Sequence, residues 1–299
     1  MAGLTETRWM IQGRRAIQLT YAAVKERHTS QLAAGLSYYF ILSFFPLLIT
    51  FAAALALVPI PGLFDQILLL MARFVPPDSM GLVRAIIRDV ISPHEAGIFS
   101  VGLVGTAWAA SGGVAALIEA VNVAYDSPDT RSFVRQRALA VGLMLGVGIL
   151  TIVALSLLVV GPAFGRWLAD KIGLGAVFVA SWPYLRWFLS ISCAVLSIEL
   201  IYTWAPAQRP SFRSTLPGAV IALATWLALS TALGVYLRNF GKLNRTYGTL
   251  AAAVALMLWL YWTGFAILVG AHFNAESTHA TQTLTPVEQR PKPRPATAA

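Results

Sequence analysis

The sequence predicts an all-α fold: a polytopic membrane protein with six transmembrane helices and short amphipathic helices at the membrane interface. Hydrophobic residues make up 57% of the 299 residues and charged residues 12%, whereas an average soluble domain has about 25% charged residues. Six separate apolar stretches are long enough to cross a bilayer, because about 20 helical residues span a hydrocarbon core of about 30 Å. Five of the six contain no Lys, Arg or Asp.

The chain divides into three regions. Residues 1–32 are expected to form a cytoplasmic amphipathic segment, and residues 33–276 a six-helix membrane domain. The spans are expected at about 33–58, 98–120, 138–160, 184–204, 216–237 and 250–273. Residues 277–299, rich in Thr, Pro and Ala, are expected to be a disordered cytoplasmic tail. The first span is too long for the apolar core of a signal peptide, so it is interpreted as a retained helix.

Three segments outside the spans show helical amphipathic spacing. In residues 1–32, Ile17, Tyr21 and Val24 fall near one face, with Arg14 and Arg15 largely opposite. Such a helix can lie in the interface with its basic face toward anionic headgroups of membrane lipids, or it can be a solvated leader. Residues 59–97 predict one or two short helices on the outer face, and residues 161–182 predict a similar but shorter segment.

The net charge of +9 comes from 22 Lys and Arg against 13 Asp and Glu. The basic residues are spread over tails and loops rather than clustered, so we expect no nucleic-acid partner. More of them lie on the side of the termini, which predicts an inner-membrane protein with both termini in the cytoplasm. The single cysteine, Cys193, closes no internal disulfide. The oligomeric state is left open, a homo-oligomer included.

Polar residues inside the first span are the first candidates for function. Tyr39, Ser43 and Pro46 share one helical face. Pro46 donates no hydrogen bond and leaves the Leu42 carbonyl without its usual partner. The face is either a structural kink packed on other helices or a flexible element lining a pathway.

The second and fourth spans contain acids. In span two, small and polar residues recur every three or four positions at Gly105, Trp108, Gly112, Ala115, Glu119, Asn122 and Asp126. This stripe is either a helix-packing contact or a functional face. Glu199 lies well inside span four, where an acid must be paired, wetted, neutral or able to reach the interface. We expect any function to reside between spans one, two and four, with Glu119 and Glu199 meeting at one depth near Arg135 or Arg137.

No catalytic motif is present. The sequence contains no Walker A loop, no HExxH, no GxSxG and no paired His–Cys metal spacing. We therefore predict no catalytic residues, no metal, no cofactor and no enzyme activity.

An ordered series of motifs resembles the YihY/BrkB family of bacterial inner-membrane proteins over about residues 20–276. The first motif is the small-residue, Tyr-Tyr and Ser-x-x-Pro pattern of span one, from Ala33 to Leu48. The later match points are Trp108, Asn122, Tyr125, the run Arg131 to Arg137, Tyr202, Pro206, Gly218-Ala219, Trp226, Tyr236, Tyr247-Gly248, Trp259-Leu260-Tyr261 and the run Gly270 to Ala275.

One position departs from this pattern. The family usually has glutamate where this chain has His272, so a fixed carboxylate does not carry over to it. The imidazole can still pair or titrate, and Glu276 lies one turn later.

The resemblance implies a six-helix inner-membrane protein, and three function classes follow. The first is a transporter or flippase-like protein for an envelope lipid or amphiphile. The second is a structural or regulatory envelope protein without a transported substrate. The third, an enzyme, is disfavoured: some family members carry the label ribonuclease BN, which we interpret as misleading because the sequence offers no set of residues for RNA hydrolysis.

Overall fold

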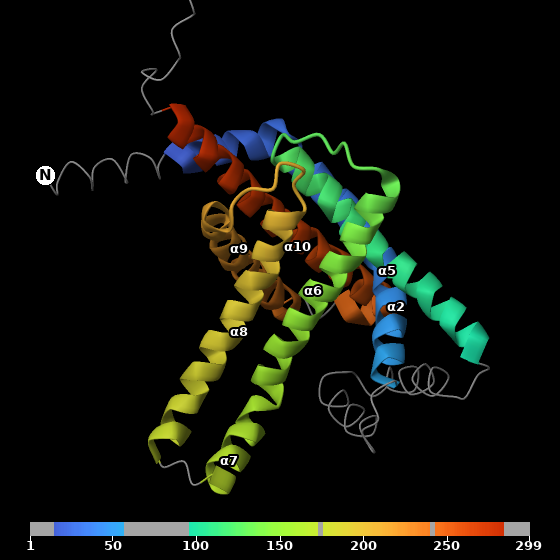
Figure 1. The fold of residues 1–299 in the computed structure, drawn as a ribbon, viewed down its shortest axis with the longest axis vertical. Helices are drawn as coiled ribbons and strands as arrows, with labels where there is room; N and C mark the ends of the chain where they lie inside the picture. The colour runs from blue at the N-terminus through green and yellow to red at the C-terminus, as the bar shows by residue number, and fades with distance from the viewer. Residues whose placement is uncertain (1–14, 57–95, 173–175, 240–242, 284–299) are drawn as a thin grey trace, which may run out of the picture.

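The computed structural model describes residues 15–56, 96–172, 176–239 and 243–283 (Figure 1). Within these residues the chain is helical, with short turns between the helices and no strand. The expected helices in residues 59–97 lie outside this described part, apart from the last residues before span two. The predicted all-α class is confirmed.

In the described chain, seven long helices follow a first helix over residues 15–26. They are α2 (Thr29–Ala56), α5 (Ala96–Ala124), α6 (Phe133–Val159), α7 (Gly161–Ile172), α8 (Ala176–Trp204), α9 (Phe212–Asn239) and α10 (Leu243–Thr283). Five of them, α5, α6, α8, α9 and α10, are long and apolar enough to cross a membrane. The helix at the remaining predicted span, α2, has 28 residues, or about 42 Å at 1.5 Å per residue.

Both ends of the described chain lie at one end of the bundle, which we call the terminal end (Figure 1). Two contacts join them: the Thr29 hydroxyl lies 2.8 Å from Nε2 of His272, and Arg27 lies 3.7 Å from Glu276. The turn from α5 to α6 and the turn from α8 to α9 are at the same end. This arrangement agrees with an even number of spans.

The core is concentrated around α5 near the terminal end. Half of the spanning part of α5 is buried, against 17% to 28% for the other four spanning helices. Leu117, Ile118 and Val121 of α5 pack with Tyr202 of α8 and Leu268 of α10. The outer helices expose many large apolar side chains, as expected of surfaces that meet lipid rather than water.

The helix over residues 15–26 does not pack against the protein through the face that carries its large apolar residues. Ala16, Thr20 and Ala23 are buried, while Ile17 and Tyr21 are 63% and 75% exposed. Small residues face the protein because they allow close packing. The large apolar residues are left outside, where an interfacial helix would contact lipid.

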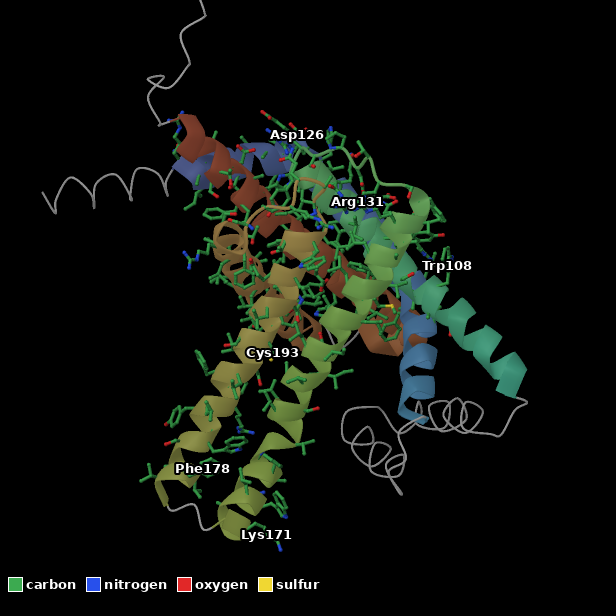
Figure 2. All side chains as sticks on the ribbon, viewed as in Figure 1. Trp108, Asp126, Arg131, Lys171, Phe178 and Cys193 are labelled. Carbon is green, nitrogen blue, oxygen red and sulfur yellow. The ribbon has the colours of Figure 1, made fainter. Side chains whose placement is uncertain are left out.

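The hairpin of α6, α7 and α8 extends away from the other helices as an arm (Figure 1). Its tip carries Phe164, Trp167, Phe178 and Trp182 in mutual ring contact, and Figure 2 places Lys171 and Phe178 there. Aromatic and basic residues together are typical of a membrane–water interface. Arg186 donates to the Leu158 carbonyl at 3.4 Å, so this cation is bound to the C-terminal turn of α6.

Two expectations need correction. The tail was expected to be disordered from residue 277, but α10 continues to Thr283, and its side chains at Ser277 and Thr278 bond back to the Asn274 carbonyl. The segment 161–182 holds the predicted short helix, α7, but its second half belongs to α8, which begins at Ala176.

The contact between α9 and α10 contains a pair of glycines, Gly218 and Gly270. A Cβ on Gly270 would collide with the Gly218 carbonyl and the Tyr202 hydroxyl, and a Cβ on Gly218 would collide with Asn274. Small residues allow such close contact between helix backbones in lipid. Gly234 of α9, in contrast, has nothing within 4 Å of its Cβ position.

Gly270→Ala should therefore destabilise the protein, whereas Gly234→Ala should not. Overpacking a close contact costs about 1–3 kcal/mol, and the Gly218 backbone cannot yield as a flexible side chain would. Thermal unfolding of the purified proteins in detergent, followed by tryptophan fluorescence, measures the difference. Equal midpoints for the two variants would contradict this packing.

Candidate functional site

The predicted polar residues separate into two groups. Tyr39, Ser43 and Glu119 lie where α2, α5 and α6 meet. Asn122, Glu199 and His272 lie in a buried layer between α5, α8, α9 and α10 near the terminal end. Pro46 is inside α2, one turn beyond Ser43.

Ser43 links α2 to α5 by entering the backbone hydrogen-bond ladder of α5. Its hydroxyl accepts from the Gly113 N–H at 2.7 Å and donates to the Ala109 carbonyl at 3.4 Å. An undisturbed α-helix would join these two backbone groups directly. A Cβ on Gly113 would lie 3.1 Å from the Ser43 hydroxyl, so glycine gives α2 the room to approach. The Ser43 face of α2 is thus a packed contact at this position.

Next to Ser43 is a pocket of about 240 Å³ between α2, α5 and α6, which we call the lateral pocket. Two aromatic side chains at its rim are exposed, Tyr39 by 49% and Phe133 by 67%. Its lining combines small residues of α5 with polar and aromatic residues of all three helices: Tyr39, Gly112, Ala115, Ala116, Glu119, Phe133, Gln136 and Arg137.

Opposite charges occupy the lateral pocket without pairing. Glu119 is exposed and accepts a 3.4 Å hydrogen bond from Gln136. Arg137 donates to the Trp108 carbonyl, and its guanidinium lies 4.5 Å from the centre of the Trp108 ring. The buried Nε of Arg137 has no hydrogen-bond partner, and no ion pair within 4.0 Å joins Arg137 to Glu119. Figure 2 shows Trp108 on the side of α5.

In the buried layer, Asn122 joins the end of α5 to the end of α8. Its amide nitrogen donates to the Ile118 carbonyl at 2.9 Å and to the Ala205 carbonyl at 3.2 Å. Its amide oxygen accepts from the Ala207 N–H at 2.9 Å. A side chain with both donors and an acceptor can meet all three needs.

Two arginines donate hydrogen bonds to carbonyls at the same helix ends. Arg131 donates to the Ala205 and Pro206 carbonyls at 2.9 and 2.7 Å. Arg27 donates to the Ala124 carbonyl at 2.8 Å and lies 3.7 Å from Glu276. The last carbonyls of a helix have no partner within it, and cations near them are favourable. Figure 2 shows Arg131 at the terminal end.

Glu199 is fully buried and faces α9. Its Oε1 accepts the hydroxyl of Thr215, and its Oε2 has no hydrogen-bond partner in the protein. Thr203, one turn further along α8, places its hydroxyl beside the same carboxyl. Glu199 therefore does not reach the interface, which excludes the account in which it extends to solvent.

Around Glu199, Asn274 binds the start of α9. It accepts from the Gly218 N–H at 2.8 Å and donates to the Thr215 carbonyl at 2.8 Å. Tyr125 lies near Asn274, but its hydroxyl makes no well-aligned hydrogen bond. Burial raises the pKa of the Tyr125 phenol, so this group stays neutral and can donate.

The imidazole of His272 is buried and is hydrogen-bonded to α2. Its Nε2 lies 2.8 Å from the Thr29 hydroxyl, and its Nδ1 has no hydrogen-bond partner. The carboxylate that pairs with Arg27 comes from Glu276, one turn later.

The expected meeting of Glu119 and Glu199 does not occur in this arrangement. Glu119 is on the exposed side of α5, while Glu199 is buried against α9. Arg137 shares the pocket of Glu119 but bonds to Trp108, and Arg135 is exposed. The stripe on α5 also divides: Gly112, Ala115 and Glu119 line the lateral pocket, whereas Asn122 enters the buried layer. Helical spacing placed these residues on one face of α5, but they contact different neighbouring helices.

Sequence reasoning missed several residues of both groups. Gln136 and Phe133 of the lateral pocket, and Thr215, Thr203 and Thr29 of the buried layer, are common residue types with no distinctive spacing. Tyr202 and Asn274 stood only within the family motifs. Among the described residues, no three His, Cys, Asp or Glu side chains gather to hold a metal.

Comparison with known proteins identifies the family. Residues 20–296 match the family described as Virulence factor BrkB. The chain belongs to this family. No solved structure matches the chain.

Relatives of this BrkB-family chain are membrane or ribonuclease-like proteins by name. This chain is 32% identical over 243 residues to the ribonuclease-like protein YfkH of Bacillus subtilis, and the match covers 81% of this chain and 88% of YfkH. It is 28% identical over 254 residues to a UPF0761 membrane protein of Alkalilimnicola ehrlichii, covering 82% of this chain and 54% of that protein. The chain thus spans about half the length of this UPF0761 relative.

Five of the motif residues converge in the buried layer of this BrkB-family chain. Asn122, Tyr202, Gly218, Gly270 and Asn274 come from four helices and contact one another or the same helix ends. They fix how α5, α8, α9 and α10 meet. The lateral pocket lies beside this layer.

Asn122→Ala should loosen the end of α8. The variant leaves the Ala207 N–H without its partner, and such a loss costs about 1–3 kcal/mol. Since 1.4 kcal/mol is a factor of ten, exchange of the Ala207 amide with deuterium should speed up by about tenfold or more. Val123→Ala, at the exposed neighbouring position, is the control. Unchanged exchange in Asn122→Ala would show that this hydrogen bond does not hold α8.

Proposed function

We propose that the protein is a transporter or flippase-like protein of the bacterial inner membrane that acts on an envelope lipid or amphiphile. The observation that carries this proposal is the lateral pocket, in which Glu119 and Arg137 stand unpaired with each other beside apolar and aromatic side chains. Charged residues at membrane depth are costly unless they have partners or a role. A headgroup with both a cationic and an anionic group would supply both partners.

The depth of the lateral pocket suits a headgroup. Glu119 is five residues before the end of α5 at Ala124, and Arg137 is four residues after the start of α6 at Phe133. At 1.5 Å per residue, both lie about 6–8 Å inside the helix ends. This is the boundary between headgroups and acyl chains in a spanning bundle.

The size of the pocket supports binding of the headgroup alone. Its 240 Å³ is below the roughly 300–1,000 Å³ of pockets that bury a drug-sized ligand. The acyl chains would remain in the lipid, against the exposed apolar side chains of α2 and α6. Pro46, one turn from Ser43 beside the pocket, gives α2 a point at which it can bend.

The alternative is a structural or regulatory envelope protein. The hydrogen bonds of Asn122, Arg27 and Arg131 favour it, since they join helix ends as a rigid frame would. On this account, changes in the lateral pocket would affect function only in proportion to folded protein. An enzyme is not supported by any set of described side chains.

Removing one charge of the lateral pocket should weaken headgroup binding selectively. For short-chain phosphatidylethanolamine we expect about tenfold weaker binding, or 1.4 kcal/mol, in Glu119→Gln and in Arg137→Gln. For short-chain phosphatidylglycerol, which has no amine, only Arg137→Gln should weaken binding. Microscale thermophoresis of the purified proteins measures both ligands.

Arg135→Gln is the matched control, because Arg135 is exposed on the same helix outside the pocket. All three variants should be tested for rescue of an envelope defect in a deletion strain. Full binding and full rescue by both pocket variants would remove the support for a transport role.

We also expect the terminal end to face the cytoplasm. Single cysteines introduced as Asp78→Cys and Thr283→Cys, in a Cys193→Ser background, report the two sides through labelling by a membrane-impermeant thiol reagent. Labelling of intact cells should occur at position 78 and not at position 283. External labelling of position 283 would reverse the orientation.

A further inference from the structure

The surroundings of Glu199 combine complete burial with several polar atoms that lack partners. Its Oε2, the Thr203 hydroxyl and the Tyr125 hydroxyl are all buried and make no hydrogen bond within the protein. The Thr203 hydroxyl lies within hydrogen-bonding reach of the Glu199 carboxyl, and Tyr125 lies close enough to that carboxyl to interact with it electrostatically. Native proteins rarely leave buried polar atoms unpaired, so a cluster of three needs an explanation.

No basic side chain neutralises Glu199. The ion pairs among the described residues join Arg27 to Asp126 and Glu276, and Arg131 to Asp129. Facing the layer are Tyr125 from α5, Tyr202 from α8 and the hydroxyl of Thr215 from α9. On α10, His272 pairs with Thr29 and Glu276 with Arg27. An isolated carboxylate here would bear a desolvation cost of several kcal/mol.

A proton removes this cost. A protonated carboxyl keeps one acceptor for Thr215 and gains one O–H donor, which the oxygens of Thr203 and Tyr125 can accept. A divalent cation would call for more acids than the described residues bring together. The hydroxyl groups around a single carboxyl suit a proton, because each can switch between donating and accepting.

We infer that Glu199, with Thr203, Thr215 and Tyr125 around it, is a proton-binding site that loads from the terminal end. The proton comes from water and forms an O–H bond on the carboxylate, whose negative charge it cancels. It returns to water when that bond breaks. This inference goes beyond the proposed function and does not depend on which headgroup binds.

The position of Glu199 favours access from the terminal end. It is five residues before the end of α8 at Trp204, about 8 Å along the helix. Tyr125, partly exposed at the end of α5, has its ring 6.5 Å from that of Tyr202. Through the Thr215 hydrogen bond, Glu199 also joins α8 of the arm to α9. A change in the charge of Glu199 would therefore change how α8 packs against α9.

Infrared difference spectroscopy of the full-length protein in lipid nanodiscs tests this site directly. We expect a carbonyl band of a protonated carboxylic acid at pH 7 that disappears reversibly at alkaline pH. The band should be lost in Glu199→Gln and kept in Glu119→Gln and Glu276→Gln. Replacing sodium chloride by choline chloride should leave the titration midpoint unchanged.

Three results would overturn the inference: no such band in the wild type, a band that persists at every pH at which the protein stays folded, or a midpoint that shifts with sodium. If Glu199→Gln fails to fold, glutamate labelled with ¹³C in the wild type assigns the band to glutamate by its frequency shift. Exchange into D₂O then reports whether the carboxyl proton exchanges, and failure to exchange would also contradict it. Because the band is expected to be kept in Glu119→Gln, which lacks the acid of the lateral pocket, the result does not depend on headgroup binding.

Discussion

The backbone at helix ends needs hydrogen-bond partners, and at the terminal end the protein supplies them with three side chains. Arg27 closes the end of α5, Arg131 closes the end of α8, and Asn122 joins the two. In lipid, burial of apolar surface does not distinguish one helix contact from another, so polar contacts and close packing set the arrangement. These contacts fix how the ends of α5 and α8 meet.

Two polar features take no part in these contacts between helix ends. The lateral pocket presents an acid and a base on the side of the bundle, between α2, α5 and α6. Glu199 is at a similar distance from the helix ends but is enclosed between α8 and α9. One feature is suited to a ligand from the membrane and the other to a proton from water. The two features are connected through α5, which lines the pocket and whose end contacts the end of α8 through Asn122 and Tyr125.

The sequence was sufficient to locate the helices but not to predict which helices pack against one another. Apolar length located the spans, and the cost of acids in lipid singled out Glu199, which the structure buries. The same spacing placed Glu119 and Asn122 on one stripe, yet they contact different helices. In a membrane protein the apolar face does not mark the interior, so periodicity cannot say which side a helix covers. The partners of Arg27 and Arg131 are backbone carbonyls, which leave no trace in residue identity.

The central claim is that the lateral pocket binds a headgroup between Glu119 and Arg137. Cryo-electron microscopy of the protein in nanodiscs containing phosphatidylethanolamine tests it most directly. The account predicts density for one headgroup in the pocket, with its phosphate toward Arg137 and its amine toward Glu119, and with acyl chains along α2 and α6. A direct Glu119–Arg137 ion pair that closes the pocket, or acyl chains alone filling it, would contradict the account.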